Sequence, residues 1–502
     1  MNLTIRFYKS NSFKVLLLLC SSICIFSCKK YVDIKQNNAE SRLITANDCQ
    51  LLLNDYANMN IGYPSDGESS ADNFYLNEPS YLSQSIEERD IYTWQSSAIR
   101  NNASPQWQYA YKVVYLSNLV LETLDKIKTN TDQTLYNDLR GQALFFRAYC
   151  FWNIAQLYAK RYTTSDANQN LGIPLRLNSD INDKSERGTV QQTYSKIIVD
   201  LIEAASLLSQ TSTVPSRPNK VAAYAMLARV YLSMEDYPSA LNNADAALKL
   251  NNQLLDYNTL SRTSTTPFTR FHKEVIFHSI MTPGSTLNPG SATSNIAKID
   301  DDLYNSYNVD DLRKYIFFKE NSQTTQLKNP LFLTTPGALE FVTVTLANGT
   351  YRFTGNYEPV TTAALFNGLA VDELYLIRAE CYARAGNKDA SMADLNSLLV
   401  NRWVVGKFVG KLAINANDAL SQVLLERRKE LVMRGQRWTD ARRLSLNFTR
   451  QIKTVNFSGF ANAPIREVVT SNTFNLSAND PRFTLLIPND VILNSSIQQN
   501  PR

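Results

Sequence analysis

The sequence predicts a mainly α-helical protein, in which tetratricopeptide-like helical repeats form one scaffold that carries long irregular loop insertions and a few short strands. Three observations lead to this fold class: a helix-pair pattern at 218–250, a related pattern at 372–399, and long stretches between them without helical period. The chain has 502 residues, of which 44% are hydrophobic and 19% charged, so it is long enough to bury a large core.

The segment 218–250 has the residue spacing of two antiparallel helices. Small residues occur where two helices would touch, and large residues flank them at helical spacing; the small ones are Ala228, Ala240, Ala244 and Ala247, and the large ones Tyr224, Leu227, Tyr231, Tyr237 and Leu241. This order resembles a tetratricopeptide repeat, a unit of about 34 residues. Because one helix pair cannot bury its apolar face alone, further repeats are expected.

Helices related to this pair are expected on both sides of it. At 372–399, Ala379 and Tyr382 take the places of Ala228 and Tyr231. Helical spacing also predicts helices at 45–59, 107–127, 135–159, 193–209 and 420–433. Together these segments predict one helical scaffold.

Four stretches lack a sustained helical period and are expected to be loop insertions: about 60–102, 160–190, 251–362 and 455–502. The first contains four Tyr, one Phe and one Trp, and this aromatic content argues against disorder. Insertions of this size among repeats favour a single domain, residues 45–502, over two independent domains or a regular superhelix.

The first 27 residues (1–27) have the pattern of a bacterial lipoprotein signal peptide. Three basic residues and no acidic residue precede an apolar run that is too short to span a membrane. The run ends in Ile25-Phe26-Ser27-Cys28, which predicts cleavage before Cys28 and acylation of this cysteine. Residues 28–44 would then form a lipidated tether. The alternative is a cleaved secretory peptide after which Cys28 has no special role.

The sequence offers little material for histidine-based catalysis or a metal site, and although Asp and Glu are plentiful, nothing fixes a catalytic pair of them. His272 and His278 are the only histidines, and neither lies in a metal-binding motif. The sequence has no Gly-rich phosphate loop, no GxSxG elbow and no fixed pair of carboxylates. Its net charge of +5 is too small to indicate nucleic-acid binding. We therefore predict no catalytic residue, no metal site, no cofactor and no enzymatic activity.

The cysteines that follow the tether do not suggest a disulfide framework. Cys49, Cys150 and Cys381 are odd in number and lack metal-ligand spacing. Cys150 and Cys381 lie in predicted helices, where a buried thiol acts as a small apolar side chain.

A charged cluster lies in the last long helix. It runs from Glu426 through Arg427, Arg428, Lys429 and Glu430 and continues to Arg437. Carboxylates beside guanidinium groups occur in catalytic sites and in structural ion networks alike. Glu426 and Glu430 bring like charges together at i,i+4 spacing, and the three basic residues between them can offset this repulsion, so we interpret the cluster as a buried or semi-buried structural ion network.

Candidate ligand-binding residues come from the aromatic-rich segment 60–102. Aromatic rings cover the apolar faces of sugars, while Asp and Asn side chains bond their hydroxyl groups. On this chemistry we predict ligand contacts from Tyr63, Asp66, Asn73, Tyr75 and Trp94. Trp107 and Tyr111 share one helical face and are expected in the core instead.

Several short motifs, spread in order along nearly the whole chain, together resemble one protein family. They are Ser27-Cys28-Lys29-Lys30-Tyr31, Arg147-Ala148-Tyr149, Leu171-Gly172-Ile173-Pro174-Leu175, Arg378-Ala379-Glu380, Glu426-Arg427-Arg428-Lys429-Glu430-Leu431 leading to Gly435, Arg437 and Trp438, Asp440-Ala441-Arg442-Arg443, and Ile487-Pro488. The chain is similar to the SusD/RagB-like nutrient-binding lipoproteins of Bacteroidetes outer membranes.

This resemblance implies a lipid-anchored outer-membrane protein that faces the cell exterior. Its implied partners are a SusC-like TonB-dependent β-barrel transporter and an oligosaccharide or other nutrient, which it captures for import. Starch, host glycans, plant polysaccharides and peptides all fit as ligands. Two alternatives of other classes are a lipid-anchored helical-repeat scaffold for protein–protein interaction and a surface hydrolase.

Overall fold

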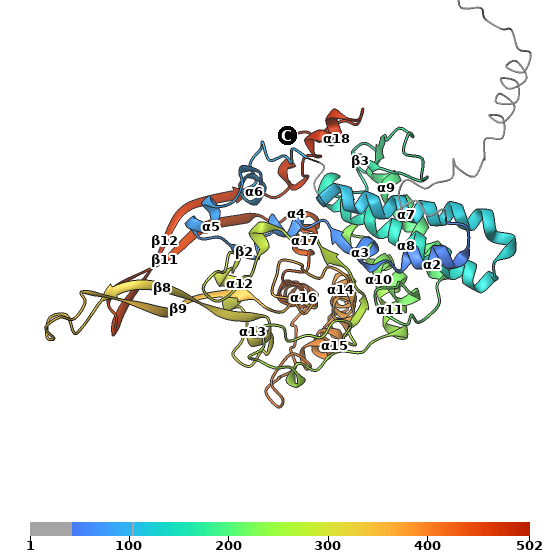
Figure 1. Ribbon diagram of the computed structural model, residues 1–502. Helices are drawn as coiled ribbons and strands as arrows, with labels where there is room; N and C mark the ends of the chain where they lie inside the picture. The colour runs from blue at the N-terminus through green and yellow to red at the C-terminus, as the bar shows by residue number, and fades with distance from the viewer. Residues whose placement is uncertain (1–42, 103–104) are drawn as a thin grey trace, which may run out of the picture. The chain divides into compact units, whose positions relative to one another are not determined.

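A computed structural model describes residues 43–102 and 105–502 of the chain (Figure 1). Ile44 to Arg502 form one compact unit. The predicted signal peptide, the predicted acylation site Cys28 and most of the predicted tether at 28–44 lie outside the described residues. Within the described ranges, no helix combines the length and the apolar character that crossing a membrane requires.

The scaffold is a row of long helices, each packed on the next (Figure 1). In chain order they are α7 (Pro105–Ile127), α8 (Gln133–Tyr158), α9 (Val190–Leu207), α10 (Lys220–Ser233), α11 (Tyr237–Leu250), α14 (Val371–Arg384), α15 (Lys388–Leu399) and α16 (Ala416–Glu430). Helix α11 packs directly against α14, although 120 residues separate them in the chain. The row is therefore continuous, and the predicted mainly helical fold with inserted segments is confirmed.

The repeat predicted at 218–250 is the pair α10 and α11. Ala228, Ala240, Ala244 and Ala247 are fully buried. Their small side chains allow the two helices to approach closely. The pair predicted at 372–399 is α14 and α15, whose Ala379 is likewise buried.

Most of the short helices lie in the segments where the sequence shows no sustained helical period. The helix predicted at 45–59 is divided at Asn54-Asp55 into two shorter ones. The short helices are α2 (Ala46–Leu53), α3 (Tyr56–Met59), α4 (Asp66–Ser69), α5 (Glu78–Leu82), α6 (Ile86–Tyr92), α12 (Asp301–Asn305), α13 (Arg313–Ile316), α17 (Arg437–Arg443) and α18 (Asn489–Leu493). Side-chain caps such as Asn77 and Ser85 begin several of them.

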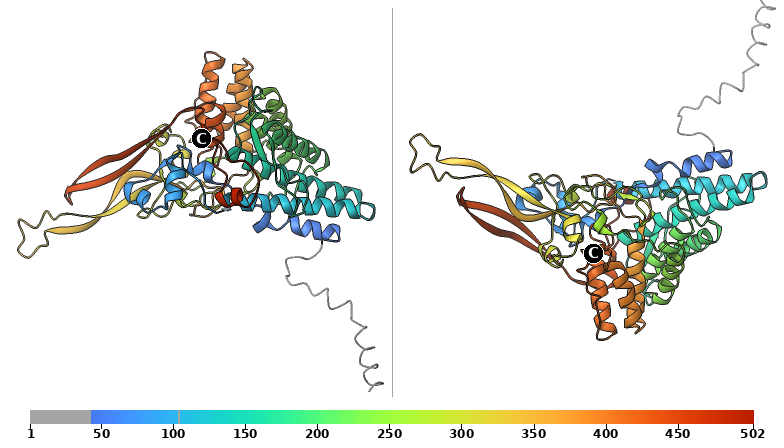
Figure 2. Two further views of the ribbon diagram at one scale, coloured as in Figure 1. Left: turned by 90° about the horizontal axis from the view of Figure 1, so that it is seen from above. Right: turned by 90° about the horizontal axis from the view of Figure 1, so that it is seen from below.

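Two long β-hairpins are the main departure from the predicted fold. Strands β8 (Phe318–Lys328) and β9 (Phe341–Phe353) form one, and β11 (Phe448–Phe460) and β12 (Ala463–Leu476) form the other. They meet at Phe460 and Lys328, giving the strand order β12-β11-β8-β9. Figures 1 and 2 show both hairpins projecting from the body of the protein.

The sequence predicted irregular loop insertions at 251–362 and 455–502 with at most a few short strands, and for the parts that form these hairpins that prediction was wrong. Most of β12 is exposed on both faces, as its burial pattern shows. A strand with two solvated faces lacks the alternation of apolar and polar residues that identifies a half-buried strand. A strand of this kind therefore leaves no clear signal in the sequence.

Four two-stranded sheets occur among the segments that precede or connect the long helices. They pair β1 (Ile61–Tyr63) with β6 (Ile280–Met281), β2 (Phe74–Tyr75) with β7 (Lys298–Ile299), β3 (Leu171–Pro174) with β4 (Arg187–Thr189), and β5 (Val275–Phe277) with β10 (Leu369–Ala370). The first two sheets join the 60–102 segment to the 251–362 segment. Both segments also share a buried apolar cluster that includes Phe74, Tyr92, Phe317 and Tyr357.

Candidate functional site

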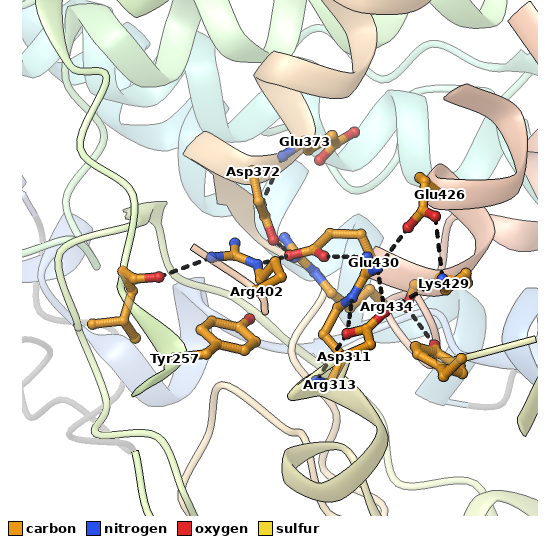
Figure 3. A network of polar contacts seen from close by, with 12 residues as sticks. Tyr257, Asp311, Arg313, Asp372, Glu373, Arg402, Glu426, Lys429, Glu430 and Arg434 are labelled. Atoms are coloured by element: carbon orange, nitrogen blue, oxygen red, sulfur yellow. Dashed lines mark hydrogen bonds and ion pairs between the residues drawn. The ribbon is translucent and has the colours of Figure 1, made fainter. Parts of the chain in front are cut away.

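The charged cluster predicted on α16 is buried, and Figure 3 shows it at the centre of a network of ion pairs. The fully buried Arg313 contacts Asp311 at 2.7 Å, Glu426 at 2.6 Å and Glu430 at 2.9 Å. Glu430 also pairs with Arg402 at 2.7 Å. The prediction of a structural ion network is thus confirmed.

The electrostatics around Glu426 oppose acid–base chemistry at this carboxylate. Burial by itself raises the pKa of Glu426, but Arg313 and Lys429 lower it to about 2. Such a carboxylate keeps its negative charge at neutral pH and has no proton to donate. Arg402 extends the network to Glu274 in the 251–362 segment, at 2.9 Å. The network therefore ties α16 to the inserted segment.

The five residues predicted to contact ligand are all buried, with exposed fractions of 5% or less. The Tyr63 hydroxyl donates to the Met59 carbonyl, Asp66 pairs with Arg100, Asn73 donates to Glu68, Tyr75 contacts Lys453, and the Trp94 indole N–H donates to the Ser70 carbonyl. They lie in one region of the core but present no open platform. This geometry gives no support to the ligand contacts predicted for them.

An open groove lies instead along α7. One wall is a face of α7, another is the segment between β3 and β4, and the third comes from α18 and the residues after it. The groove measures about 380 Å³ and is lined by Trp107, Tyr111, Tyr115, Pro174, Arg176, Asn178, Ile181, Ser185, Val491, Ser495 and Ile497. We call it the aromatic groove.

Three aromatic residues of α7 line this groove because they recur every fourth residue and so share one helical face. Trp107 is buried, and its ring centroid lies 4.8 Å from that of Tyr111. The Tyr111 hydroxyl donates to the Pro174 carbonyl at 2.8 Å. Tyr115 is 40% exposed, and its hydroxyl has no hydrogen-bond partner within the described part of the chain.

The core prediction for Trp107 and Tyr111 is therefore right for Trp107 and incomplete for Tyr111, which is half-buried and lines the groove. Tyr115 was not predicted at all. The signal for it was the same four-residue spacing, continued by one more turn of the helix.

The polar wall of the groove is held in a fixed shape. The Arg176 guanidinium donates to Ser185 Oγ at 3.1 Å and to the carbonyls of Asp180 and Asp183. Ser185 Oγ accepts that bond, so its own hydrogen can still be donated to a ligand. Asn178 donates to the Asp183 carboxylate at 2.7 Å.

A relay of buried side chains connects this wall to the helical scaffold. Asp200 on α9 pairs with Arg147 on α8 at 2.8 Å, and Arg147 donates to Asn118 Oδ1 on α7 at 2.9 Å. Asn118 in turn donates to the carbonyls of Arg176 and Asn178, each at 3.0 Å. The Arg147 motif noted in the sequence thus positions the groove wall through Asn118.

The β3–β4 wall of the aromatic groove also depends on Gly172, close to where this wall starts. A Cβ atom at Gly172 would overlap the Thr189 carbonyl and the Thr193 hydroxyl. Only glycine allows β3 to approach β4 and α9 this closely. This explains Gly172 within the motif at 171–175.

The described residues provide neither a cluster of metal ligands nor an activated thiol. No group of three or more His, Cys, Asp or Glu side chains there is arranged to hold a metal ion. Cys49, Cys150 and Cys381 are free and buried. Burial raises the pKa of each thiol, so none of them is activated as a nucleophile.

Two family models match this chain. Residues 30–232 match a model described as "Starch-binding associating with outer membrane", and residues 372–502 match the SusD family model. Together they span well over half of the sequence. The chain belongs to the SusD family.

Proteins of known sequence and of known structure are similar to this chain. SusD-like protein P2 of Formosa agariphila is 28% identical over 143 residues, a stretch that spans 28% of this chain and only 25% of that relative. A SusD superfamily protein from Bacteroides thetaiotaomicron is 22% identical, with a TM-score of 0.68 over 91% of this chain and 100% of the other. A putative sugar binding protein from Bacteroides vulgatus is also 22% identical, with a TM-score of 0.67 over 92% and 99%.

The aromatic groove of this SusD family member is built from both matched regions. Its α7 and β3–β4 walls lie in the first match, and Val491, Ser495 and Ile497 lie in the second. The inserted segment 233–371, which includes the β8–β9 hairpin, lies outside both matches.

Proposed function

We propose that this protein is a cell-surface lipoprotein that binds an oligosaccharide and delivers it to a SusC-like TonB-dependent outer-membrane transporter, with no chemistry of its own. The observation that carries the proposal is the aromatic groove. Its volume of about 380 Å³ falls within the usual range for ligand sites, which is about 300–1,000 Å³. The family descriptions support a carbohydrate as the ligand and the outer membrane as the location.

The chemistry of the groove suits a sugar. The exposed ring of Tyr115 offers an apolar face for a pyranose, and its hydroxyl is available for a hydrogen bond. Ser185 and Asn178 supply further polar groups on the opposite wall. Because this wall is already fixed by Arg176 and Asn118, little ordering is needed when a ligand binds.

A glycan array tests the ligand half of the proposal. The wild-type protein should bind one class of oligosaccharide, and Tyr115→Ala should lose that signal. Tyr109→Ala is the matched control, because Tyr109 is an exposed tyrosine on the same helix that does not line the groove. Equal signals from Tyr115→Ala and the wild type would remove the groove from the proposal.

Isolation of the tagged full-length protein from outer membranes in mild detergent tests the delivery half. Recovery of a stoichiometric β-barrel transporter, together with an acylated Cys28 in the mature protein, would support it. An unacylated Cys28 would contradict the lipid anchor.

One observation favours the second candidate function, a lipid-anchored scaffold for other proteins. The tip of the β8–β9 hairpin exposes a run of apolar side chains, namely Leu331, Phe332, Leu333, Leu339 and Phe341. Exposed apolar patches of this kind often mark sites of protein interaction. If the isolated protein carried other partners but no transporter, and the array showed no glycan, the scaffold would replace the uptake function.

A further inference from the structure

A second, smaller pocket lies in the inserted segment and shares no residue with the aromatic groove. It measures about 190 Å³ and is formed by the turn at 289–292, the end of β9, and two threonines. Its lining residues are Thr265, Pro289, Gly290, Ser291, Ala292, Arg352, Phe353, Thr354 and Thr361. This lining contains one cation and four hydroxyl groups, and it contains no carboxylate.

The cation in this pocket, Arg352, is 9% exposed and forms no ion pair with any carboxylate of the described residues. The buried Arg147 and Arg313 pair with acidic side chains, whereas the buried Arg450 donates to three main-chain carbonyls. A buried guanidinium without a counter-charge is costly unless another group compensates it. The missing acidic partner distinguishes Arg352 from Arg147 and Arg313.

Arg352 is nevertheless held in place by one of its three nitrogens. Its Nη1 donates to the Glu320 carbonyl at 2.7 Å and to Asn321 Oδ1 at 3.3 Å. A register shift in β8 at this point brings both acceptors to it. The planar guanidinium group of Arg352 forms a fork, and Nε and Nη2 are its other edge. These two nitrogens make no hydrogen bond within residues 43–102 and 105–502.

Buried polar side chains in turn hold Asn321, one of the two groups that accept a hydrogen bond from Arg352. Asn321 is 2% exposed and donates to Thr350 Oγ1 at 2.9 Å and to Asn295 Oδ1 at 3.1 Å. Thr350 donates to Asn348 Oδ1 at 2.8 Å. The guanidinium is therefore oriented before any ligand arrives, which is the arrangement that lowers the entropic cost of binding.

The surroundings of Arg352 add positive charge. Burial, reinforced by Arg352, lowers the pKa of Lys319 to about 8. The pKa of Arg352 is itself lowered by burial, with no neighbouring acid to oppose the effect. An anion in the pocket would compensate this charge.

We propose that this pocket binds the oxoanion group of an acidic ligand, a carboxylate or a sulfate, through the free edge of the Arg352 fork, with Ser291 and Thr361 hydroxyls lining the site. Planar guanidinium groups recognise such groups by paired, charge-assisted hydrogen bonds. The group could belong to an acidic saccharide or to a free inorganic anion. Arg352 lies outside both matched regions of the chain, and the inference stands independently of the aromatic groove.

Titration calorimetry of the full-length protein in low-salt chloride buffer tests this inference. The probes are sodium sulfate, sodium glucuronate, an oligosaccharide of glucuronic acid, and glucose as a neutral control. We expect the wild type to bind at least one anion, Arg352→Gln to lose affinity for that anion at least about tenfold, and any binding of glucose to be the same in both proteins. Arg262→Gln removes an exposed arginine from the same segment and should bind like the wild type.

A second variant keeps the test decisive if Arg352→Gln does not fold. Ser291→Asp places a carboxylate at an exposed position on the pocket wall and should also lose anion binding about tenfold. Saccharide binding that exceeds sulfate binding identifies an acidic sugar as the source; equal binding identifies a general anion site. Absence of anion binding by the wild type, or unchanged affinity in a folded Arg352→Gln or Ser291→Asp protein, would overturn the proposal.

Discussion

The guanidinium carbon of Arg450 lies 4.8 Å from the centre of the Trp94 indole ring, inside the protein. It also lies 3.9 Å from the Tyr92 ring and 5.2 Å from the Phe74 ring. Its nitrogens donate to the main-chain carbonyls of Ser69, Ala71 and Tyr92. The aromatic rings of 60–102 thus enclose a cation of β11, which attaches this insertion to the second hairpin.

Replacing Arg450 should destabilise the fold. Arg450→Met keeps much of the side-chain volume but leaves three buried carbonyls without their donor, so we expect a loss of about 2–4 kcal/mol in the free energy of unfolding. Urea unfolding followed by circular dichroism measures it. Arg262→Met, at an exposed position, should change stability by less than about 0.5 kcal/mol. An Arg450→Met protein as stable as this control would show that the enclosed cation contributes nothing.

Asn118 should affect ligand binding without touching the ligand. Asn118→Ala removes both hydrogen bonds to the wall of the aromatic groove, so the wall becomes less ordered and the saccharide affinity should fall roughly tenfold, about 1.4 kcal/mol. Calorimetry on the folded variant measures the affinity. Asn243→Ala is the control, because Asn243 bonds only the Ser239 carbonyl of its own helix. Equal affinities for the two variants would contradict the proposed role of Asn118.

The ion network in Figure 3 predicts a large stability effect at Arg313. Arg313→Met leaves Asp311, Glu426 and Glu430 buried without their shared cation, and we expect a loss of about 3–5 kcal/mol. The midpoint of urea unfolding reports the loss. A much smaller value would indicate that water or Lys429 replaces the arginine.

Acid should destabilise the protein through His272. Burial, opposed by Asp372 and reinforced by Arg434, lowers the pKa of His272 from 6.5 to about 3. Between pH 6.5 and 3 the unfolded chain binds a proton that the folded chain does not, so stability is complete above pH 6.5 and falls as the pH decreases, by up to about 1.4 kcal/mol per pH unit.

Unfolding measured from pH 7.5 to 4 tests this contribution. His272→Leu lacks the titrating group, so its stability should decline less steeply than that of the wild type over this range. Parallel pH profiles for the two proteins would show that His272 does not titrate in this way.

Patterns that report burial on one face predicted the scaffold well. Ala228 and Ala244 identified two touching helices, because small residues at helical spacing are what close helix packing requires. The direct contact of α11 with α14 could not be predicted, because 120 residues separate them and no local pattern records it. The exposed strand β12 left no pattern at all.

The candidate site was harder to predict, because composition does not distinguish an exposed ring from an enclosed one. Trp94 and Tyr75 looked like a sugar platform, but their rings pack against Arg450 and Lys453. Tyr115 continues the spacing of Trp107 and Tyr111, yet only the fold shows that the segment 171–189 leaves its ring open.

The most direct test of the proposed function is the affinity of Tyr115→Ala for the oligosaccharide that the wild type selects, measured by titration calorimetry beside Tyr109→Ala. Loss of one stacked ring should weaken binding by about 1–2 kcal/mol, which is roughly five- to thirtyfold, while Tyr109→Ala binds like the wild type. If Tyr115→Ala bound as tightly as Tyr109→Ala, the aromatic groove would not be the saccharide site.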